Sequence, residues 1–420
     1  MNRQWSLTPL SKCLAKVIDY RGRTPRKLGR EWASAGYRAL SANNVKFSGL
    51  DKLESINYAD EALYLEWMKE EVCRGDLLLT SEAPSGQIML WDSDEKIVLS
   101  QRLYALRTNS TIDAVFLKYY LQSPSGQKEI YRNNSGSTVA GISAKTFDNI
   151  LIRHPEKNVQ QRIGHLLYSI DKKIDCNNRI NAELETMAKT LYDYWFVQFD
   201  FPDANGKPYK SSGGKMDYSA TLKREIPAGW SDSSVLAVAD LLGGGTPTKK
   251  KPEYWGGSIP FFTPTDADGT IFKFSTADYI TEEGLKGSST KRFGKHTVFI
   301  TARGSVGRLV LAGVDMAMNQ SCYALRAKSG ISHVFLFFLT KELIHHLQVK
   351  SSGSVFDSIV SNDIELTKLA IPKGELIEKF AEFIEPAFEK IANNTKQNQQ
   401  LAELRDWLLP MLMNGQVTVA

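Results

Sequence analysis

Two short basic stretches carry residues whose chemistry can be interpreted directly. One reads RGRTPRKLGR from Arg21 to Arg30, and the other reads GGGTPTKKKPEYWGG from Gly243 to Gly257. A Thr-Pro turn sets the direction of the backbone and leaves the flanking side chains free. Because each neutralised phosphate releases counterions, clustered cations of this kind suit a polyanion such as a nucleic acid. For either stretch taken alone, a solvated surface loop is the alternative.

Polar residues near these stretches are candidates for reading base edges. Arginine suits guanine, asparagine or glutamine suits adenine, and serine or threonine tolerates either. The candidate DNA contacts are Arg21, Arg23, Thr24, Arg26, Lys27, Arg30, Ser85, Gln87 and Gln101, with Thr246, Thr248, Lys249, Lys250, Lys251, Arg303, Ser305, Arg308 and Gln320 in the second half. Glu82 corresponds to Arg303, so the two sets differ in charge. Similar frames with different reading residues predict recognition of two different short sequences.

No catalytic pattern accompanies these residues. The six histidines show no HExxH spacing, and the sequence contains no GxxxxGK[ST] phosphate loop. Asp266 and Asp268 are more typical of turn residues than of a nuclease carboxylate pair. Tyr254 and Trp255 could stack on a base, but a role in capping a core is favoured. These residues predict a binding protein with two reading heads, without a metal site or catalytic residues.

The composition is compatible with this interpretation but does not require it. A chain of 420 residues that is 42% hydrophobic can form two or three domains. The net charge of +5 permits a polyanionic partner. The longest apolar run, Val334 to Leu339, is far shorter than a membrane span, and the first residues lack a signal-peptide pattern. Four cysteines without a CxxC spacing fit a reducing compartment, so we expect a cytoplasmic protein.

The two basic stretches belong to a long internal repeat. TSEAPSGQIML from Thr80 is matched by TARGSVGRLVL from Thr301, and SQRLYALR from Ser100 is matched by NQSCYALR from Asn319. Further on, NNSGSTVAGIS (133–143) is matched by KSSGSVFDSIV (350–360). The landmarks keep their order over each half, which indicates a duplicated domain and not a solenoid unit.

Each copy combines a region of short strands with a long helix. Short β-like runs separated by Gly, Ser and Asn turns predict strands, with one helix near Val115 to Tyr131 and its counterpart near Val334 to Gln348. The predicted parts are 1–155, a helical spacer at 156–200, a linker at 201–218, a second domain at 219–373 and a second spacer at 374–420. The expected fold class is α+β, with two pseudo-twofold-related domains joined by two long antiparallel, coiled-coil-like helices.

A heptad pattern describes both helices. In the first, the a positions are Ile163, Ile170, Asn177, Leu184 and Leu191, and the d positions are Leu166, Lys173, Ile180, Met187 and Tyr194. In the second, they are Phe380, Ala387, Asn394, Leu401 and Leu408, with Phe383, Lys390, Gln397, Leu404 and Met411. The same Asn and Lys interrupt both apolar rows, and a polar residue in such a row can determine register at a cost in stability.

Antiparallel pairing about a pseudo-twofold axis predicts that Asn177 meets Lys390. By symmetry, Lys173 then meets Asn394. The alternative is that each helix packs only on its own domain and leaves these polar positions exposed. Pro386 is expected to kink the second helix or to start a new one.

The length of the seam suggests a role in spacing. From Ile163 to Met187 it would extend about 36 Å at ~1.5 Å per residue. One turn of B-DNA is ~34–36 Å long, so the helices are suited to hold two reading heads one turn apart.

The chain resembles the DNA-specificity subunits of type I restriction–modification systems. The resemblance is carried by GGGTPTKKKPEYWGGSIPFFTP, TARGSVGRLVL, NQSCYAL and IPKGELIEKFAEFI, and by the segment from HPEKNVQQRIGHLLYSID to TLYDYWFVQFDF and on to KPYKSSGGKMDYSATLKREIPAGW. The first copy departs from this pattern: it lacks KKPEYW after Thr-Pro, and EAPSG replaces ARGSVG. The two domains are therefore expected to hold DNA differently.

The resemblance implies two target-recognition domains, each reading one half of a split site in double-stranded DNA. It also implies that two helical regions separate these domains and dock two methyltransferase subunits, which bind S-adenosylmethionine. Two restriction subunits, which use ATP and Mg²⁺ to translocate and cut DNA, would complete the assembly. No cofactor is expected on this chain itself. The alternatives are a specificity subunit of another assembly that cuts at a fixed distance, an enzyme with an unrecognised active site, and a structural coiled-coil adaptor.

Overall fold

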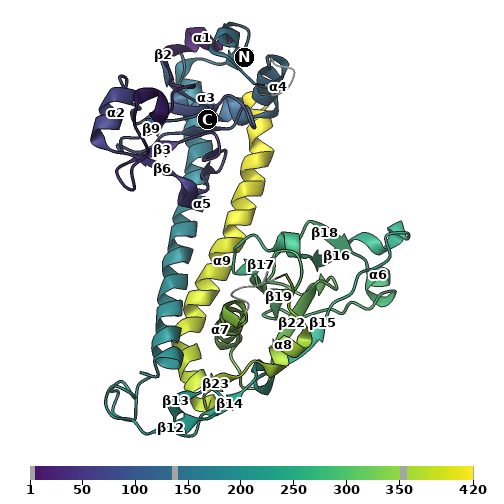
Figure 1. Ribbon diagram of the computed structural model, residues 1–420. Coiled ribbons are helices and arrows are strands. Elements are labelled where there is room, and N and C mark those ends of the chain that lie inside the picture. Colours follow the sequence, from purple (N-terminus) through teal and green to yellow (C-terminus); the bar gives the residue numbers. More distant parts are fainter. Residues whose placement is uncertain (1–4, 135–140, 351–356, 420) are drawn as a thin grey trace. The chain divides into compact units, whose positions relative to one another are not determined.

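The computed structural model describes residues 5–134, 141–350 and 357–419, whose elements are labelled in Figure 1. These residues form two compact units. Unit 1 comprises Met1–Ile174 with Gln400–Ala420, and unit 2 comprises Asp175–Gln399. The boundary between the units falls inside both long helices, so each unit contains a part of each of them.

Unit 1 contains a four-stranded sheet with the order β2-β10-β7-β8 and a three-stranded sheet with the order β6-β3-β9. The strands of these sheets are β2 (Leu14–Asp19), β10 (Leu103–Thr108), β7 (Leu77–Thr80), β8 (Ile88–Leu90), β6 (Asn57–Ala59), β3 (Tyr37–Leu40) and β9 (Val98–Leu99). Two strand pairs complete the unit: β1 (Ser6–Pro9) with β11 (Leu151–His154), and β4 (Val45–Lys46) with β5 (Gly49–Leu50). Its shorter α-helices are α1 (Leu10–Cys13), α2 (Glu61–Trp67), α3 (Ala114–Gln122) and α4 (Pro124–Arg132).

Unit 2 contains a five-stranded sheet with the order β15-β22-β19-β20-β17 and a three-stranded sheet with the order β18-β16-β21. The strands of these sheets are β15 (Ala239–Gly243), β22 (Cys322–Ala327), β19 (Val298–Thr301), β20 (Leu309–Ala312), β17 (Phe272–Lys273), β18 (Asp278–Ile280), β16 (Trp255–Phe262) and β21 (Ala317–Met318). The remaining pairs are β12 (Met216–Ser219) with β13 (Arg224–Pro227), and β14 (Ser231–Ser233) with β23 (Leu369–Ile371). Its shorter α-helices are α6 (Glu282–Lys286), α7 (His333–Lys350) and α8 (Ser361–Leu366).

The two units repeat one topology in chain order. The order β2-β10-β7-β8 corresponds to β15-β22-β19-β20, β6-β3-β9 corresponds to β18-β16-β21, and β1-β11 corresponds to β14-β23. Each three-stranded sheet even has one antiparallel and one parallel pair. The predicted duplication is therefore confirmed, although part of the matched segments 133–143 and 350–360 lies outside the described residues.

The helix predicted near Val115 to Tyr131 is two helices, α3 and α4. Asp113 caps the first, accepting a hydrogen bond from the backbone of Phe116 at 2.9 Å. Ser123 has extended backbone angles, as a residue before proline prefers, and Pro124 then opens α4. No proline occurs at the corresponding place in unit 2, and α7 runs without a break, as predicted.

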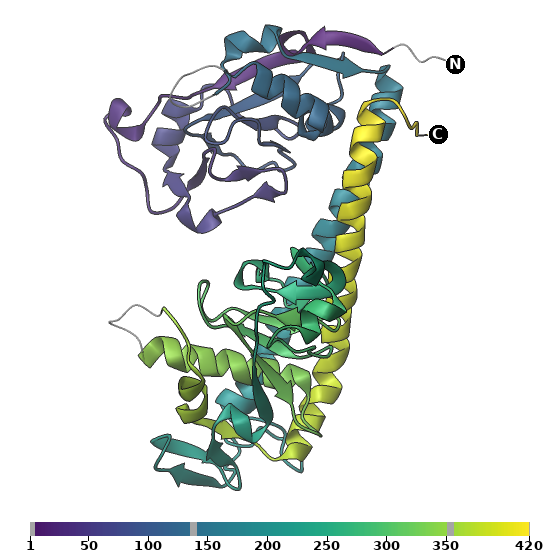
Figure 2. The same ribbon diagram turned by 90° about the vertical axis from the view of Figure 1, so that its right-hand side faces the viewer.

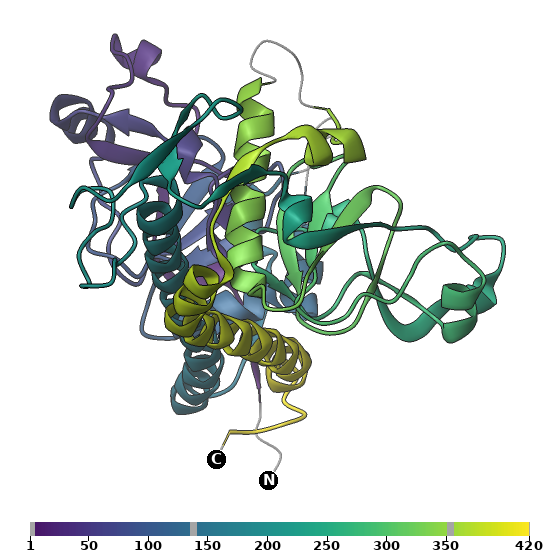
Figure 3. The ribbon, with the colours of Figure 1, turned by 90° about the horizontal axis from the view of Figure 1, so that it is seen from below.

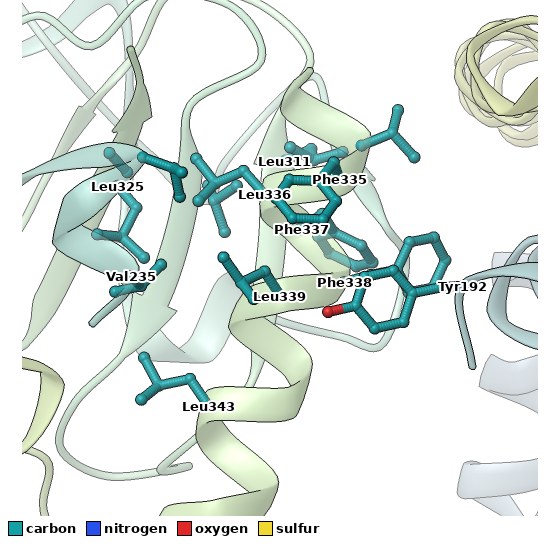
Figure 4. Packing of buried hydrophobic residues seen from close by; sticks show 14 of the residues in the cluster. Tyr192, Val235, Leu311, Leu325, Phe335, Leu336, Phe337, Phe338, Leu339 and Leu343 are labelled. Atoms are coloured by element: carbon teal, nitrogen blue, oxygen red, sulfur yellow. The ribbon is translucent and has the colours of Figure 1, made fainter. Parts of the chain in front are cut away.

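Helix α7 closes the core of unit 2 by lying against its sheet (Figure 3). In Figure 4, Leu336 and Leu339 face Leu325 and Val235, while Phe338 lies beside Tyr192 of the long helix α5. The rings of Phe338 and Tyr192 stack with centroids 5.3 Å apart. One buried cluster therefore joins sheet, α7 and long helix inside this unit.

The two long helices are α5 (Lys157–Tyr192), which ends in a π-helical turn at Asp193–Val197, and α9 (Gly374–Met413). They run side by side in both Figure 1 and Figure 2. The prediction that Pro386 starts a new helix is wrong, because α9 continues through it. Pro386 is exposed, on the side of α9 that faces solvent, and it removes one backbone N–H donor from the helix without ending it.

The helices pair antiparallel, but the predicted register is wrong. Asn177 donates hydrogen bonds of 2.8 Å to Gln397 and Asn398, and Asn394 donates one of 2.9 Å to Asn181. Asn181 lies four residues after Asn177 on α5, and its partner Asn394 lies four residues before Asn398 on α9, as in an antiparallel pair. The expected partner Lys390 lies about two turns before Asn398.

The predicted lysine partners, Lys173 and Lys390, are exposed instead. Asparagine amides are neutral and can exchange hydrogen bonds across the seam, whereas burying an ammonium group there would carry the larger cost of desolvating a charge. The register therefore brings together the asparagines and leaves the lysines in solvent.

The buried face of each helix also differs from the predicted a and d rows. The residues at the a positions are buried or partly buried, as Ile163 and Ala387 show. A second buried row lies four residues after the a positions: Leu167 follows Ile163, and Ile391 follows Ala387. The d row includes exposed apolar residues such as Met187 and Phe383. In each unit, both helices contribute buried residues to the core of the domain as well as packing on one another. The buried face of each helix is therefore shared between the domain and the other helix.

Among the described residues, no helix combines the length and the hydropathy that a membrane span requires.

Candidate nucleic-acid interface

The candidate loops of unit 2 lie at one edge of its five-stranded sheet. Gly243, at the end of β15, pairs with Tyr323 at the start of β22. Thr301, at the end of β19, pairs with Cys322 of the same strand. The second basic stretch, the β19–β20 loop and the turn before β22 therefore leave the sheet together.

Unit 1 places its candidate loops in the same way. Asp19, at the end of β2, pairs with Tyr104 near the start of β10. Thr80, at the end of β7, pairs with Leu103. Strand topology thus collects loops that are about 60 to 80 residues apart in the sequence, as expected for antiparallel neighbours, and it does so once in each unit.

Most cations of the first basic stretch are bound to their own domain. Arg21 forms an ion pair with Asp19 through two bonds of 2.9 Å, and its guanidinium lies 3.9 Å from the centroid of the Tyr104 ring. Its pKa is raised, because these partners more than compensate for the burial of the guanidinium. Arg21 is therefore a structural residue and does not present a free charge.

The other residues of this stretch follow the same trend. Arg23 donates to the backbone carbonyl of Trp67 at 2.8 Å, Lys27 donates to Gly22 at 2.6 Å, and Arg30 pairs with Glu66 at 2.9 Å. Thr24 caps the 3₁₀ turn Pro25–Leu28 by accepting from the backbone of Lys27. Arg26 is exposed, and its side chain has no hydrogen-bond or ion-pair partner within the described part of the chain.

The second basic stretch presents its cations more openly. Lys249 and Lys250 are exposed, and Lys250 has no side-chain partner among the described residues. Lys249 lies 6.0 Å from the centroid of the Trp255 ring, and Lys251 donates to the hydroxyl of Tyr254 at 3.0 Å. The second stretch therefore contains fewer basic residues, but a larger share of them lacks a hydrogen-bond or ionic partner for the side chain among the described residues.

Packing explains the aromatic and acidic residues that follow. Trp255 packs edge-on against Phe261 at 5.4 Å, which confirms its predicted core role. Asp266 accepts from the backbone of Thr263 and Ala277, so it is a turn residue, as predicted.

The glycine run before the second Thr-Pro serves close packing. A Cβ on Gly244 would lie 2.1 Å from the carbonyl oxygen of Asn319, and one on Gly245 would lie 2.1 Å from the Ser289 hydroxyl. This tight base lets Thr246 donate a hydrogen bond to Gln320 from the turn before β22. The structure therefore joins two candidate residues that are far apart in the sequence.

The loops after β7 and β19 share one internal hydrogen-bond pattern. The hydroxyl of Thr80 donates to the carbonyl of Pro84, and that of Thr301 donates to Ser305. Of the candidates here, Gln87 accepts from the backbone of Phe47 at 3.1 Å, Ser85 bonds to Asn134, and Arg308 donates to Ala267. These three residues shape the loops.

The exposed tips of the two loops differ in charge. Glu82 lies 3.4 Å from Arg102, so the positive charge of Arg102 offsets the negative charge of Glu82 at the surface. Arg303, at the corresponding position, is exposed and has no ionic partner among the described residues. Gln101 is also exposed, next to Arg102.

Sequence reasoning missed the acids that neutralise the first stretch. The stretch from Arg21 to Arg30 contains five cations and no acid, but Asp19 and Glu66 from outside it pair with two of them. Asp19 lies only two residues before the stretch, so its position was a usable signal. Glu66 comes from helix α2 and could be found only in the folded domain.

A family model described as "Type I restriction modification DNA specificity domain" matches residues 12–186 and again 227–403. The chain belongs to this family. The double match agrees with the repeated topology, and it confirms the resemblance to type I specificity subunits inferred from the sequence motifs.

Individual members of the specificity family support this assignment. The chain is 24% identical over 352 residues to the type I restriction enzyme MjaIX specificity subunit of Methanocaldococcus jannaschii, covering 82% of this chain and 78% of the relative. It is 23% identical over 403 residues to the HindI specificity subunit of Haemophilus influenzae, covering 83% and 88%.

A solved structure shares the fold of this specificity-family chain. The S subunit of a type I restriction–modification system from M. genitalium superposes with a TM-score of 0.60 at 15% identity, covering 98% of this chain and 96% of the other. At this identity the likeness concerns the fold, a mixture of helices and short strands repeated in two domains.

We expect Gly244→Ala to distort the base of the second basic stretch. Its new Cβ would meet backbone oxygens of Asn319 and Met318 at 2.1 and 2.6 Å, which do not yield easily. Overpacking of this kind costs about 1–3 kcal/mol, so thermal unfolding should show a lower midpoint and duplex DNA should bind more weakly. Gly243→Ala is the matched control, because nothing lies within 4 Å of its Cβ. Equal behaviour of the two variants would contradict the packing role.

Proposed function

We propose that this chain reads a split site in double-stranded DNA, with one half recognised by each unit, as the specificity subunit of a DNA methyltransferase and restriction complex. The observation that carries the proposal is the repeated sheet edge, where each unit gathers three loops with exposed polar and cationic side chains. A duplicated edge of this kind suits a ligand that offers two similar surfaces, as a DNA duplex does.

Phosphate contacts would supply most of the affinity. The candidates with free charge are Arg26 in unit 1 and Lys249, Lys250 and Arg303 in unit 2. Cations already paired within the domain, such as Arg21, would gain less from a phosphate, because they would have to give up an existing partner.

Differences between the two edges would give each unit its own half-site. Unit 1 presents the Glu82–Arg102 pair where unit 2 presents Arg303. A carboxylate accepts from the amino group of cytosine, whereas an unpaired guanidinium suits guanine. The two halves of the site are therefore expected to differ in sequence.

The long helices would determine the distance between the half-sites. Both are continuous, with α5 covering 36 residues and α9 covering 40. In this proposal, inserting residues into both helices changes the gap in the recognised site and leaves its two halves unchanged.

Catalysis would belong to partner subunits. Two methyltransferase subunits would bind S-adenosylmethionine, and two restriction subunits would use ATP and Mg²⁺. The exposed apolar residues of the long helices are the proposed docking points for the methyltransferases: Met187 (49% exposed) and Phe383 (65%) in unit 2, and Leu404 (44%) and Trp407 (63%) in unit 1. Large exposed apolar side chains on a helix are typical of a protein-binding surface.

Methylation mapping tests the proposal as a whole. Genomic DNA from cells with and without this gene, together with the genes for its methyltransferase, should differ in one split motif. Replacing residues 1–155 with the corresponding region of a relative should change one half of that motif and keep the other. A change in both halves, or a continuous motif, would contradict the proposal.

Loss of free cations should weaken DNA binding in a salt-dependent way. For Lys250→Ala and Arg303→Ala, we expect the slope of log affinity against log salt to fall by about one for each phosphate contact removed. Fluorescence anisotropy with a labelled random-sequence duplex measures this effect. Lys396→Ala, an exposed lysine on α9, serves as the control. The same slope in all three variants would remove these residues from the interface.

Substitution of the exposed apolar residues should reduce docking of the methyltransferase. Phe383→Ser and Trp407→Ser are each expected to lower the number of methyltransferase subunits bound, and native mass spectrometry of the co-expressed complex counts them. Lys390→Ser is the matched control on the same helix. Retention of two subunits by the double variant would place the docking surface elsewhere.

A further inference from the structure

A buried ionic cluster fastens the first domain to both long helices inside unit 1. Asp171 of α5 lies at its centre. Lys118 of α3 lies 3.0 Å from one carboxylate oxygen, and the neighbouring Tyr119 donates its hydroxyl to the same oxygen. Arg405 of α9 lies 2.8 Å from the other oxygen and also contacts Asp406.

The centre of this cluster is shielded from water, while Arg405 at its edge is 29% exposed. The side chains of Lys118 and Asp171 are only 8% and 17% exposed. Burial alone would raise the pKa of Asp171, but the Lys118 charge and the hydrogen bonds from Tyr119 and Arg405 hold it below its usual range. The carboxylate is therefore charged, and it depends on its partners.

Unit 2 has an aromatic cluster at the corresponding place. Aligning VFLKYYL (115–121) with VFLFFLT (334–340) matches Lys118 and Tyr119 with Phe337 and Phe338. Aligning the long helices on their shared asparagines matches Asp171 with Phe388 and Arg405 with Ala188.

These four counterparts pack together. Phe388 lies 5.9 Å from the Phe337 ring and 5.7 Å from the Phe338 ring, and Ala188 is fully buried in the same cluster (Figure 4 shows the α7 residues). One junction is thus ionic and the other apolar, although they derive from the same ancestral position.

Some seam positions do not distinguish one long helix from the other. Asn177 and Leu184 on α5 have identical counterparts, Asn394 and Leu401, on α9. On these positions alone, α5 of one chain could pair with α5 of another chain, or α9 with α9, in the same register. The α5–α9 pair must therefore be selected by positions that differ between the helices, such as Gln397, whose counterpart is Ile180, and those at the junctions with the domains.

We propose that the unlike junctions make this selection. In an α9–α9 pair, Arg405 would face the Phe388 ring in place of Asp171 and keep only its neighbour Asp406 as an acid. In an α5–α5 pair, Asp171 would face Ala188; it would keep Lys118 and Tyr119 but lose the guanidinium that neutralises its second oxygen. A buried charge deprived of its partner is strongly destabilising, whereas an ionic cluster and an apolar one can be similarly stable when each is complete. The junctions act by penalising the wrong pairs, and this inference does not depend on DNA recognition.

The first experiment keeps the composition of the full chain constant. In the mismatched variant, Ala188→Arg with Arg405→Ala, the cation moves to the aromatic junction. We expect its thermal unfolding midpoint to fall by roughly 10 °C. In the fully exchanged variant, all four positions of unit 1 trade residues with their counterparts in unit 2, so both clusters are complete again. We expect it to recover at least half of that loss.

A size control separates charge from bulk at the buried position. Ala188→Leu adds volume without charge, and it should lower the midpoint less than Ala188→Arg does. The proposal is overturned if the mismatched variant unfolds at the wild-type midpoint, if the full exchange recovers nothing, or if Ala188→Leu is as harmful as Ala188→Arg.

A second experiment measures selection directly. Replacing Lys118, Tyr119, Asp171 and Arg405 with Phe, Phe, Phe and Ala makes both junctions apolar and removes the discrimination. When two differently tagged copies are refolded together, this variant should form more mixed-tag complexes than the wild type in a sequential pull-down. An equal fraction of mixed complexes in the two proteins would overturn the proposal.

Discussion

The hydrogen bonds between α5 and α9 set the register in which these two antiparallel helices pair. Asn177 and Asn394 occupy the same seam position of the two helices. Asn177 bonds to Asn398, one turn after Asn394, and Asn394 bonds to Asn181, one turn after Asn177. Amides inside an apolar seam accept only a register in which their donors find acceptors. The register in turn decides which residues of α5 and α9 meet in each unit.

A second level of organisation follows from duplication. Each unit builds the same sheet order and brings the same three loops to one edge, but the residues that hold those loops differ. In unit 1 most of the basic residues are used internally, whereas Lys250 and Arg303 of unit 2 remain free. Two copies of one scaffold can therefore carry different surface chemistry, which is what recognition of an asymmetric site requires.

Much of the fold could be predicted from the sequence because its signals are local or periodic. The repeat, the long helices and the continuous α7 depend on residue order and on helix periodicity. The break between α3 and α4 was equally local, at Ser123-Pro124, yet the apolar pattern concealed it. The heptad frame was less reliable: periodicity finds an apolar face, but it does not say how that face is shared between a partner helix and a domain.

The family, the duplication and the loops that contain the candidate contacts could be identified from the order of residues. Which of those residues present a free charge follows from the folded domains. Arg21 and Arg26 are alike in the sequence, but Arg21 is bound by Asp19 and Tyr104 while Arg26 is exposed. The physical reason is that the availability of a charge depends on acids and rings brought from other strands and helices, and this proximity is a property of the folded chain.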